Sequence, residues 1–332
     1  MKRLCRSHAG VLFAGLSLAV PMLLGAGIVQ AQQDYPSRPV KLIVPYPPGG
    51  GVDTAARIVA QPLSERLGQT IVIENKPGAS GAIGTTVAAH EKPDGYTLLL
   101  SSTGPHGLDP HLFKKLNFDP IEDFTFIAMI YNAPTFLIVP ASSPFRTVQE
   151  LIVHGKANPG KLNYGSSGIG SAQNIGAALL MEAGGFEATH VIYKGASAML
   201  AALVAGQIDF AVDMPTCLPF IQAGKLRVLG VASRVRNGAL PGIPTLDELG
   251  IPGVYASCYY GLAGPAKVPK DIVDKLNKEI NAIIQTDEIQ ARLANMGVEP
   301  GEGTPGDFRA FAESELKTYG ELFNRIGVEK ID

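Results

Sequence analysis

The chain has 332 residues, 46% of them hydrophobic and 17% charged, and its formal net charge is −2. This composition is typical of a packed globular protein and differs from that of disordered or low-complexity chains. Because the charge is nearly balanced and no basic runs occur, the sequence argues against nucleic acid or an anionic membrane surface as a partner.

Residues 1–31 have the pattern of a secretory signal. Three basic residues lie among the first six, residues 10–29 form an apolar stretch, and a small-residue cleavage pattern ends at Ala31. An uncleaved membrane anchor is the alternative, since the apolar stretch is nearly long enough to span a bilayer. Pro21 within that stretch and the cleavage pattern favour a signal. We therefore predict cleavage after Ala31, export to the periplasm and a mature chain that begins at Gln32.

Export would leave 25 basic residues against 30 acidic ones, a net charge of −5, because the removed segment carries three basic and no acidic residues. No second apolar run approaches membrane-spanning length, so we expect the exported chain to be soluble. Its two cysteines, Cys217 and Cys258, could pair in an oxidising compartment or remain buried thiols. The sequence leaves both alternatives open.

Strand-like apolar runs alternate with helical patterns along most of the exported chain. The strand-like runs are Val40–Val44, Thr70–Glu74, Tyr96–Leu100, Phe124–Ile130, Thr135–Val139, Leu162–Gly165, His190–Tyr193, Ile208–Val212 and Leu226–Val231. The helical patterns between them are Val52–Leu67, Gly81–His90, Thr147–Asn158, Ser171–Ala183 and Ser197–Ala205. This alternation predicts mostly parallel sheets with helices on both faces.

The C-terminal part changes character, with one further apolar run followed by helical patterns. These segments are Tyr255–Gly264, Pro269–Gln285, Glu288–Met296 and Pro305–Ile326. Because the strand-like runs are many for one sheet, we predict an α/β fold of two lobes with a cleft between them. The predicted boundaries place residues 32–130 and 256–332 in lobe 1 and residues 131–255 in lobe 2.

The stretch VKLIVPYPPGGGVDTAAR, from Val40 to Arg57, is the most informative in the chain. A strand, a turn of prolines and glycines and a helix N-terminus follow one another, so backbone N–H groups converge on one point and favour an anion. We expect Asp53 to cap the helix, because a second negative charge would oppose a bound carboxylate. Arg57, one turn later, could pair with it. Pro62 should kink or split the helix after Ala60.

Three further turns place small residues, hydroxyls and backbone N–H groups after predicted strands. They are SSTG at 101–104, YGSSGIGS at 164–171 and YKGAS at 193–197. For each turn alone, the alternative is an ordinary turn with a serine cap. Ligands of open α/β sheets bind at the C-terminal edge of the strands, so four such turns over two lobes favour one shared site. One helix terminus contributes only about 0.3–1 kcal/mol to anion binding, whereas micromolar affinity needs about 8 kcal/mol, so several turns must contribute.

Enzyme signatures are weak in this chain. It has no G-x-S-x-G elbow, no G-K-[ST] P-loop and no H-E-x-x-H motif, so we predict no catalytic residue, no cofactor and no metal site. Ser101 or Ser102 with His106 could be imagined as nucleophile and base, but nothing supplies an orienting acid or an oxyanion hole. Asp213 ends a strand at the predicted cleft edge, where it could accept a hydrogen bond from a ligand amino or hydroxyl group, or cap the next helix.

Several motifs together resemble the tripartite tricarboxylate transporter substrate-binding receptors, often called Bug proteins, of the TctC type. Besides the opening stretch they are IVIENKPGASGAIG at 71–84, KPDGYTLLLSSTG at 92–104, FDPIEDF at 118–124, LNYGSSGIGSAQN at 162–174, VIYKG at 191–195 and AGQIDF at 205–210. The resemblance covers nearly all of the mature chain. It implies the two-lobed fold of periplasmic binding proteins, a type II-like Venus flytrap whose central cleft closes on a small solute.

The resemblance also implies a function and a site. Such a receptor would bind a small carboxylate (a dicarboxylate, an aromatic acid or an amino acid) and deliver it, as a monomer, to membrane permease subunits. The implied ligand-binding residues are Tyr46, Pro48, Gly49, Gly50, Ser101, Ser102, Ser166, Ser167, Gly170, Ser171, Ala172, Gln173, Tyr193, Lys194, Gly195 and Asp213. Two alternative functions stay open: a sensor subunit that reports the solute to a membrane kinase, and a periplasmic hydrolase of a small ester or amide.

Overall fold

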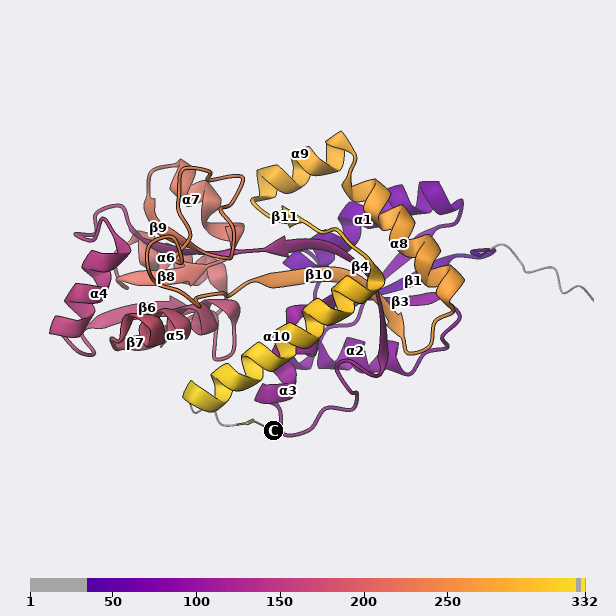
Figure 1. Ribbon diagram of the computed structural model, residues 1–332, viewed down its shortest axis with the longest axis horizontal. Helices are drawn as coiled ribbons and strands as arrows, with labels where there is room; N and C mark the ends of the chain where they lie inside the picture. Colours follow the sequence, from indigo (N-terminus) through magenta and orange to yellow (C-terminus); the bar gives the residue numbers. More distant parts are fainter. Residues whose placement is uncertain (1–34, 327–329, 332) are drawn as a thin grey trace, which may run out of the picture. The chain divides into compact units, whose positions relative to one another are not determined.

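Two β-sheets, each with helices on both faces, make up the described part of the chain (Figure 1). The computed structural model describes residues 35–326, 330 and 331. The predicted signal segment, residues 1–31, lies outside the described residues.

The first sheet has six strands. They are β1 (Val40–Val44), β2 (Ile71–Asn75), β3 (Thr97–Ser102), β4 (Phe124–Ala133), β10 (Cys258–Pro265) and β11 (Glu299–Pro300). Their order across the sheet is β11-β4-β10-β3-β1-β2. β1 runs parallel to β2 and β3, whereas β10 is antiparallel to β3 and β4, and β11 is antiparallel to β4.

The second sheet has five strands. They are β5 (Thr135–Pro140), β6 (Leu162–Ser166), β7 (Ala188–Ile192), β8 (Phe210–Asp213) and β9 (Leu226–Ala232). Their order is β7-β6-β8-β5-β9. β6 runs parallel to β7 and β8, and β5 is antiparallel to β8 and β9.

The prediction of an α/β fold with two lobes is confirmed, but both sheets are mixed where mostly parallel sheets were predicted. Parallel pairing requires a crossover connection, usually a helix. β5 follows β4 directly across Pro134, and β10 returns from the second sheet, so neither strand arrives through such a crossover. Both therefore pair antiparallel with their neighbours, and β4 and β10 run side by side between the sheets (Figure 1).

The chain passes from the first sheet to the second between Ala133 and Thr135 and returns between Ala232 and Cys258. The predicted limit after residue 130 falls inside β4, because that apolar run continues as one strand. The second predicted limit falls within the returning segment. As limits of independent lobes, both positions stay predictions.

Thirteen helical segments lie between or after these strands in the described residues. They are α1 (Gly51–Leu67), η1 (Ala79–Gly81), α2 (Ala82–Ala89), the π-turn η2 (Gly104–Leu108), α3 (Asp109–Leu112), α4 (Val148–Ala157), α5 (Ala172–Gly184), α6 (Ala196–Val204), η3 (Pro215–Cys217), α7 (Leu218–Gln222), α8 (Lys270–Ile284), α9 (Asp287–Met296) and α10 (Pro305–Ile326). None of these described helices combines the length and apolar character needed to cross a bilayer.

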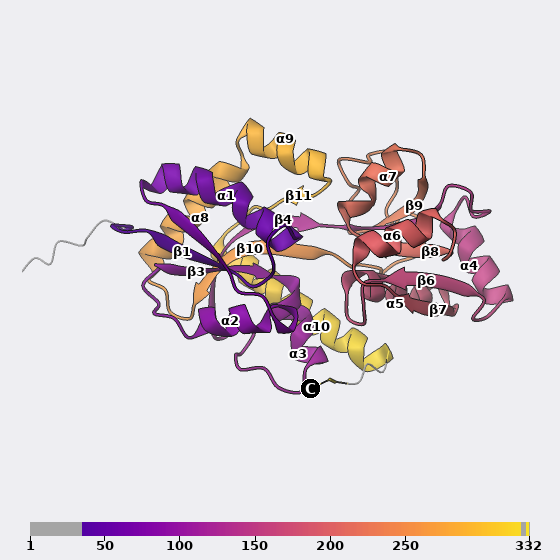
Figure 2. The same cartoon turned by 180° about the vertical axis from the view of Figure 1, so that it is seen from behind.

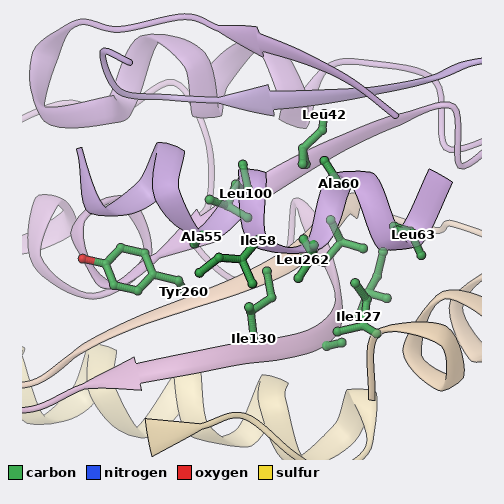
Figure 3. Close-up of a cluster of buried hydrophobic side chains, with 14 of the residues drawn as sticks. Leu42, Ala55, Ile58, Ala60, Leu63, Leu100, Ile127, Ile130, Tyr260 and Leu262 are labelled. Atoms are coloured by element: carbon green, nitrogen blue, oxygen red, sulfur yellow. The ribbon is translucent and has the colours of Figure 1, made fainter. Parts of the chain in front are cut away.

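Both faces of the first sheet are buried, which explains its unbroken apolar runs. Leu42 and Leu100 pack in one cluster with Ile58 of α1 (Figure 3). Leu99, the residue before Leu100 on β3, lies on the opposite face of the sheet and packs in another cluster with Phe308 of α10. Because burying a leucine contributes about 1.5–3 kcal/mol, helices on both faces hold the strand ends in fixed positions.

The second sheet is covered in the same way (Figure 2). Leu137 and Val212 pack in a cluster with Ile175 of α5. Phe136, one residue earlier on β5, packs in a different cluster with Met199 of α6. The alternation places α5 and α6 on opposite faces of the sheet. Because β6 and β7 are parallel, the turns that lead from them into α5 and α6 lie at the same edge of the sheet.

Pro62 was predicted to kink or split its helix, and the split is wrong: α1 runs without interruption from Gly51 to Leu67. A kink at Pro62 stays a prediction. A proline inside a helix removes one backbone hydrogen bond. The apolar stripe of α1 continues past it, with Val59 before the proline and Leu63 after it both buried against the sheet. Tertiary packing therefore outweighs the local cost of the proline.

Candidate functional site

A cavity of about 380 Å³ is lined by turns from both sheets. Its lining residues are Tyr46, Val52, Ser80, Ser102, Thr103, Gly104, Leu108, Asp109, Leu112, Ser167, Gly168, Ile169, Gly170, Ser171, Cys258 and Tyr260. A volume of this size suits a small organic molecule. These lining residues, all in the described part of the chain, include neither lysine, arginine nor histidine, so an anion held here must rely on hydrogen bonds and helix termini.

Asp53 supports the glycine turn between β1 and α1. Its Oδ2 accepts a hydrogen bond from the Gly49 N–H at 2.9 Å and from Arg57 Nε at 2.7 Å. Its Oδ1 accepts one from Asn75 Nδ2 at 3.0 Å. The Arg57 hydrogen bond holds the pKa of Asp53 at about 2. The predicted pairing with Arg57 is present, but the cap position belongs to Gly50, so Asp53 acts from the first helical turn.

The glycine turn offers fewer free N–H groups than the sequence suggested. Gly49 has a φ of +86°, a conformation that favours glycine. Because its N–H donates to Asp53, that donor is not available to a ligand. Gly49 lines a second cavity, described below, whereas Pro48 and Gly50 are exposed residues outside both cavity linings.

Tyr46 forms part of the cavity wall. Its hydroxyl donates a hydrogen bond to the Ser80 carbonyl oxygen at 2.6 Å, and burial raises the pKa of the phenol. A Cβ atom built at Gly104 would lie 2.5 Å from the Tyr46 hydroxyl oxygen. Glycine at position 104 is therefore what allows Tyr46 to approach the end of β3.

The two serines at the end of β3 are buried, and neither Oγ atom has a hydrogen-bond partner among the described residues. Ser102 lines the cavity, and Ser101 does not. His106 is fully buried, with Nδ1 2.6 Å from the Pro120 carbonyl oxygen, and burial lowers its pKa to about 4. The imagined serine–histidine pair is therefore not assembled, and His106 is a core residue that packs 4.7 Å from the Phe124 ring.

The turn between β6 and α5 is held by its own serines. Ser166 Oγ accepts the Gly168 N–H at 3.0 Å and lies 2.6 Å from His190 Nε2. Ser171 is the N-cap of α5, where its Oγ accepts the Asn174 N–H at 3.3 Å. Ser171 lines the cavity, whereas Ser166 is buried beneath the turn. Ser171 is thus a serine cap, as the alternative interpretation of this turn proposed.

A chain of hydrogen bonds leads from the cavity wall to Asp213. Ser167 Oγ donates to Gln173 Oε1 at 3.0 Å, and Gln173 Nε2 donates to Asp213 Oδ1 at 3.0 Å. Asp213 Oδ2 accepts the Thr216 hydroxyl at 2.8 Å. Asp213 is completely buried outside the cavity lining, and burial raises its pKa to about 6. In this arrangement Asp213 fixes Gln173 and Ser167 through hydrogen bonds.

The structure brings only part of the predicted site together. Of the predicted residues, the cavity lining contains Tyr46, Ser102, Ser167, Gly170 and Ser171. Ala172 and Gln173 form the first turn of α5 behind that lining. The predicted turn Tyr193–Gly195 precedes α6 and also lies outside the lining. Binding of a ligand by any of these residues stays a prediction.

Sequence reasoning missed three chemically distinctive lining residues: Asp109, Cys258 and Tyr260. Tyr260 and Cys258 lie on β10, whose register places Tyr260 opposite Ser102. That antiparallel pairing joins segments far apart in the chain, so no local pattern could reveal it. Asp109 follows the π-turn η2, which breaks the regular periodicity on which the predictions depended.

Tyr260 also lines the second cavity of about 380 Å³. This cavity lies along the start of α1 and includes Gly49, Gly51, Met214 and Leu218. A Cβ atom built at Gly51 would lie 2.8 Å from the Tyr260 hydroxyl oxygen. Tyr260 is therefore shared by both cavities.

Cys217 and Cys258 are free thiols, which decides between the two alternatives for the cysteines. Burial raises the pKa of Cys258 to about 12 and raises that of Cys217 as well. Both thiols are therefore poor nucleophiles at neutral pH. Among the described residues, no group of three or more histidine, cysteine, aspartate or glutamate side chains could hold a metal ion.

Comparison with known proteins connects this geometry to a family. The family model for the tripartite tricarboxylate transporter family receptor, TctC, matches residues 55–328. The chain is 35% identical to the UPF0065 protein of the tcbD-tcbE intergenic region of Pseudomonas sp. (strain P51), over 93% of this chain and 92% of that protein. It is 30% identical to Protein BugT of Bordetella pertussis, over 96% of each chain.

Solved structures agree with these matches. R. palustris Rpa4515, solved with adipate, is similar at a TM-score of 0.79 and 33% identity, covering 90% of this chain and 100% of that one. MatC from Rhodopseudomonas palustris, solved with bound malate, is similar at a TM-score of 0.73 and 30% identity, covering 87% of this chain and 99% of that one. The chain therefore belongs to the tripartite tricarboxylate transporter receptor family of Bug and TctC proteins.

Proposed function

We propose that this chain is an exported periplasmic receptor that binds one small carboxylate and delivers it to the permease subunits of a tripartite tricarboxylate-type transporter. The observation that carries the proposal is the cavity lined by turns of both sheets. The adipate and malate present in two similar structures support a carboxylate as the solute. The residues proposed to contact it are Tyr46, Ser102, Ser167, Gly170 and Ser171.

Hydrogen bonds can hold a carboxylate in a cavity that has no basic lining side chain. Ser102 Oγ lies in the lining without a partner among the described residues, so it is a candidate donor. The N-terminus of α5, capped by Ser171, adds a favourable dipole of about 0.3–1 kcal/mol, and up to about 2 kcal/mol when partly buried. Micromolar affinity needs about 8 kcal/mol, so several such contributions, made away from water, must add together.

A thermal-shift screen tests solute binding. We expect at least one of adipate, L-malate, benzoate and L-glutamate to raise the melting temperature of the purified protein. At a concentration of about 100 Kd, a ligand that binds only the folded state adds about 2.7 kcal/mol of stability. The uncharged diamide of each responding dicarboxylate serves as the matched control. Equal shifts with acid and amide, or no shift with any acid, would contradict the proposal.

Delivery to a permease needs a separate test. We expect uptake of the responding acid into cells to fall when the gene for this chain is deleted and to return on complementation. Normal uptake in the deletion strain would overturn the transport role while leaving solute binding intact. In that case the sensor subunit would be the alternative to test next.

A further inference from the structure

Asp109 is a buried acid in the wall of the cavity. It is 2% exposed and belongs to the cavity lining. Its Oδ2 has no hydrogen-bond partner, and it forms no ion pair with any described residue. Leaving a buried carboxyl group without partners is costly, more so when it is ionised.

The groups around the cavity leave Asp109 without a counter-ion. The titratable residues that share the lining with it are Tyr46, Cys258 and Tyr260. Burial raises the pKa of all three, so they are uncharged at neutral pH. Ser102 Oγ lines the same cavity and is likewise without a partner.

Titratable groups on the elements packed against Asp109 do not pair with it either. On its own segment and near the C-terminus they are His106, His111 and Lys330, and on α10 the buried or half-buried acids and phenols are Glu315 and Tyr319. The basic residues of α10 pair with other acids: Arg309 with Glu122 and Glu313, Lys317 with Glu321, and Arg325 with Glu182. Both histidines and Lys330 bond backbone carbonyl oxygens, and Tyr319 donates to another carbonyl. Glu315 is an acid whose pKa burial raises to about 7, and a carboxyl group supplies no positive charge in either protonation state.

We propose that Asp109 is a solute-contacting residue that, in its protonated form, donates a hydrogen bond to a carboxylate oxygen of the bound acid. This inference rests on the proposed function and adds a consequence to it. Because a carboxyl group and a carboxylate share one proton in such a contact, solute binding takes up a proton whenever Asp109 is ionised in the free protein. The class of solute favoured is an organic acid without an ammonium group.

The direction of the pH effect follows from the free protein. Burial raises the pKa of Asp109 to about 7, so at pH 6.5 the group is mostly protonated and ready to donate. Above that pKa the free group is ionised and repels an anionic solute, and each further pH unit weakens binding up to about tenfold. An ammonium-bearing solute would have the opposite effect, because it would ionise Asp109 and release a proton.

Isothermal titration calorimetry with adipate and with L-malate tests the inference. We expect the better-bound acid to bind wild type about 20-fold more weakly at pH 8.5 than at pH 6.5, as expected for a pKa near 7. In buffers of different ionisation enthalpy, binding at pH 8.5 should take up close to one proton. Asp109→Asn keeps an N–H donor of similar shape but does not titrate, so its affinity should change less than about threefold over this range. Asp287→Asn, which removes an exposed acid on α9, should behave as wild type.

The outcomes separate this inference from the proposed function. Binding that is independent of pH, with no proton uptake by wild type, would overturn the role of Asp109 and leave the receptor function intact. Proton release on binding of adipate or L-malate would overturn it, because binding would then favour the ionised form of Asp109. Tight binding of L-glutamate that Asp109→Asn abolishes would show recognition of an ammonium group and also overturn it. Failure of every acid to bind at pH 6.5 would overturn both. Absence of proton uptake by wild type would by itself overturn the role of Asp109, so the inference stays falsifiable even if the asparagine variant folds poorly.

Discussion

Asp53 is a buried carboxylate whose partners all support one turn. It is 2% exposed and accepts hydrogen bonds from Gly49, Arg57 and Asn75. Charge-assisted hydrogen bonds of this kind are stronger than neutral ones. Because its pKa is lowered to about 2, the stability that Asp53 contributes is present above its ordinary pKa near 4 and is lost as the pH falls toward 2.

Replacing Asp53 by asparagine should therefore lower the stability of the protein in a pH-dependent way. At pH 7 we expect the free energy of unfolding to fall by about 1–3 kcal/mol, because the ion pair and part of the turn's hydrogen bonding are lost. The difference from wild type should shrink as the pH is lowered from 5 to 3. Urea denaturation at each pH measures it. Asp274→Asn, which affects only an exposed pair with Lys270, should change stability by less than about 0.5 kcal/mol, and equal effects of both variants would contradict this account.

At the scale of elements, the turn from β1 to α1 depends on one glycine more than on its neighbour. Gly49 has a φ of +86°, whereas Gly50, the N-cap, has a φ of −80° in the extended region. A Cβ atom at Gly50 would meet nothing closer than 3.8 Å, so side chains are tolerated there. The conformational demand for glycine is thus confined to Gly49.

Alanine substitutions at the two glycines form a matched pair. Gly49→Ala should lower the free energy of unfolding by about 1–2 kcal/mol, because a left-handed conformation is unfavourable for a residue with a Cβ atom. Gly50→Ala should be nearly neutral. Thermal and urea denaturation of both variants check this expectation. A larger loss for Gly50→Ala than for Gly49→Ala would mean that the turn has a different backbone conformation.

The same elements show how far sequence reasoning reaches. The run Val40–Val44 coincides with β1, because a strand buried on both faces leaves a continuous apolar signature. The run Tyr255–Gly264 likewise indicated β10, but its antiparallel place beside β3 could not be predicted, since pairing partners far apart in the chain decide it. Tyr260 and Asp109 were missed for that reason and because of the π-turn. The serine turns were recognised as polar, but which hydroxyls face the cavity depends on hydrogen bonds such as that from Ser167 to Gln173.

At the scale of the whole molecule, the cavity walls belong to turns of two sheets joined by β4–β5 and by the segment returning to β10. A bound solute would contact both sets of turns at once. α10 also connects the two parts. Phe323 packs in the cluster of Leu137 and Ile175 on the second sheet, and Arg325 pairs with Glu182 of α5 at 2.7 Å. Any closing movement must therefore accommodate this helix.

We expect solute binding to make the protein more compact. Small-angle scattering with saturating adipate, or with the acid that gives the largest thermal shift, should report a smaller radius of gyration than the solute-free protein. The uncharged diamide of the same acid is the control and should leave the profile unchanged. Identical profiles with and without a bound acid would contradict closure while leaving binding itself intact.

The unpaired Cys217 has a practical consequence. Its side chain is completely buried in the core cluster of the second sheet, with α6 and α7 around it. A thiol-reactive dye can modify Cys217 only after that core opens. In a Cys258→Ser background the labelling rate therefore measures how often the core of the second sheet opens. Once Cys258 is replaced by serine, labelling of Cys217 thus reports local opening of the second sheet.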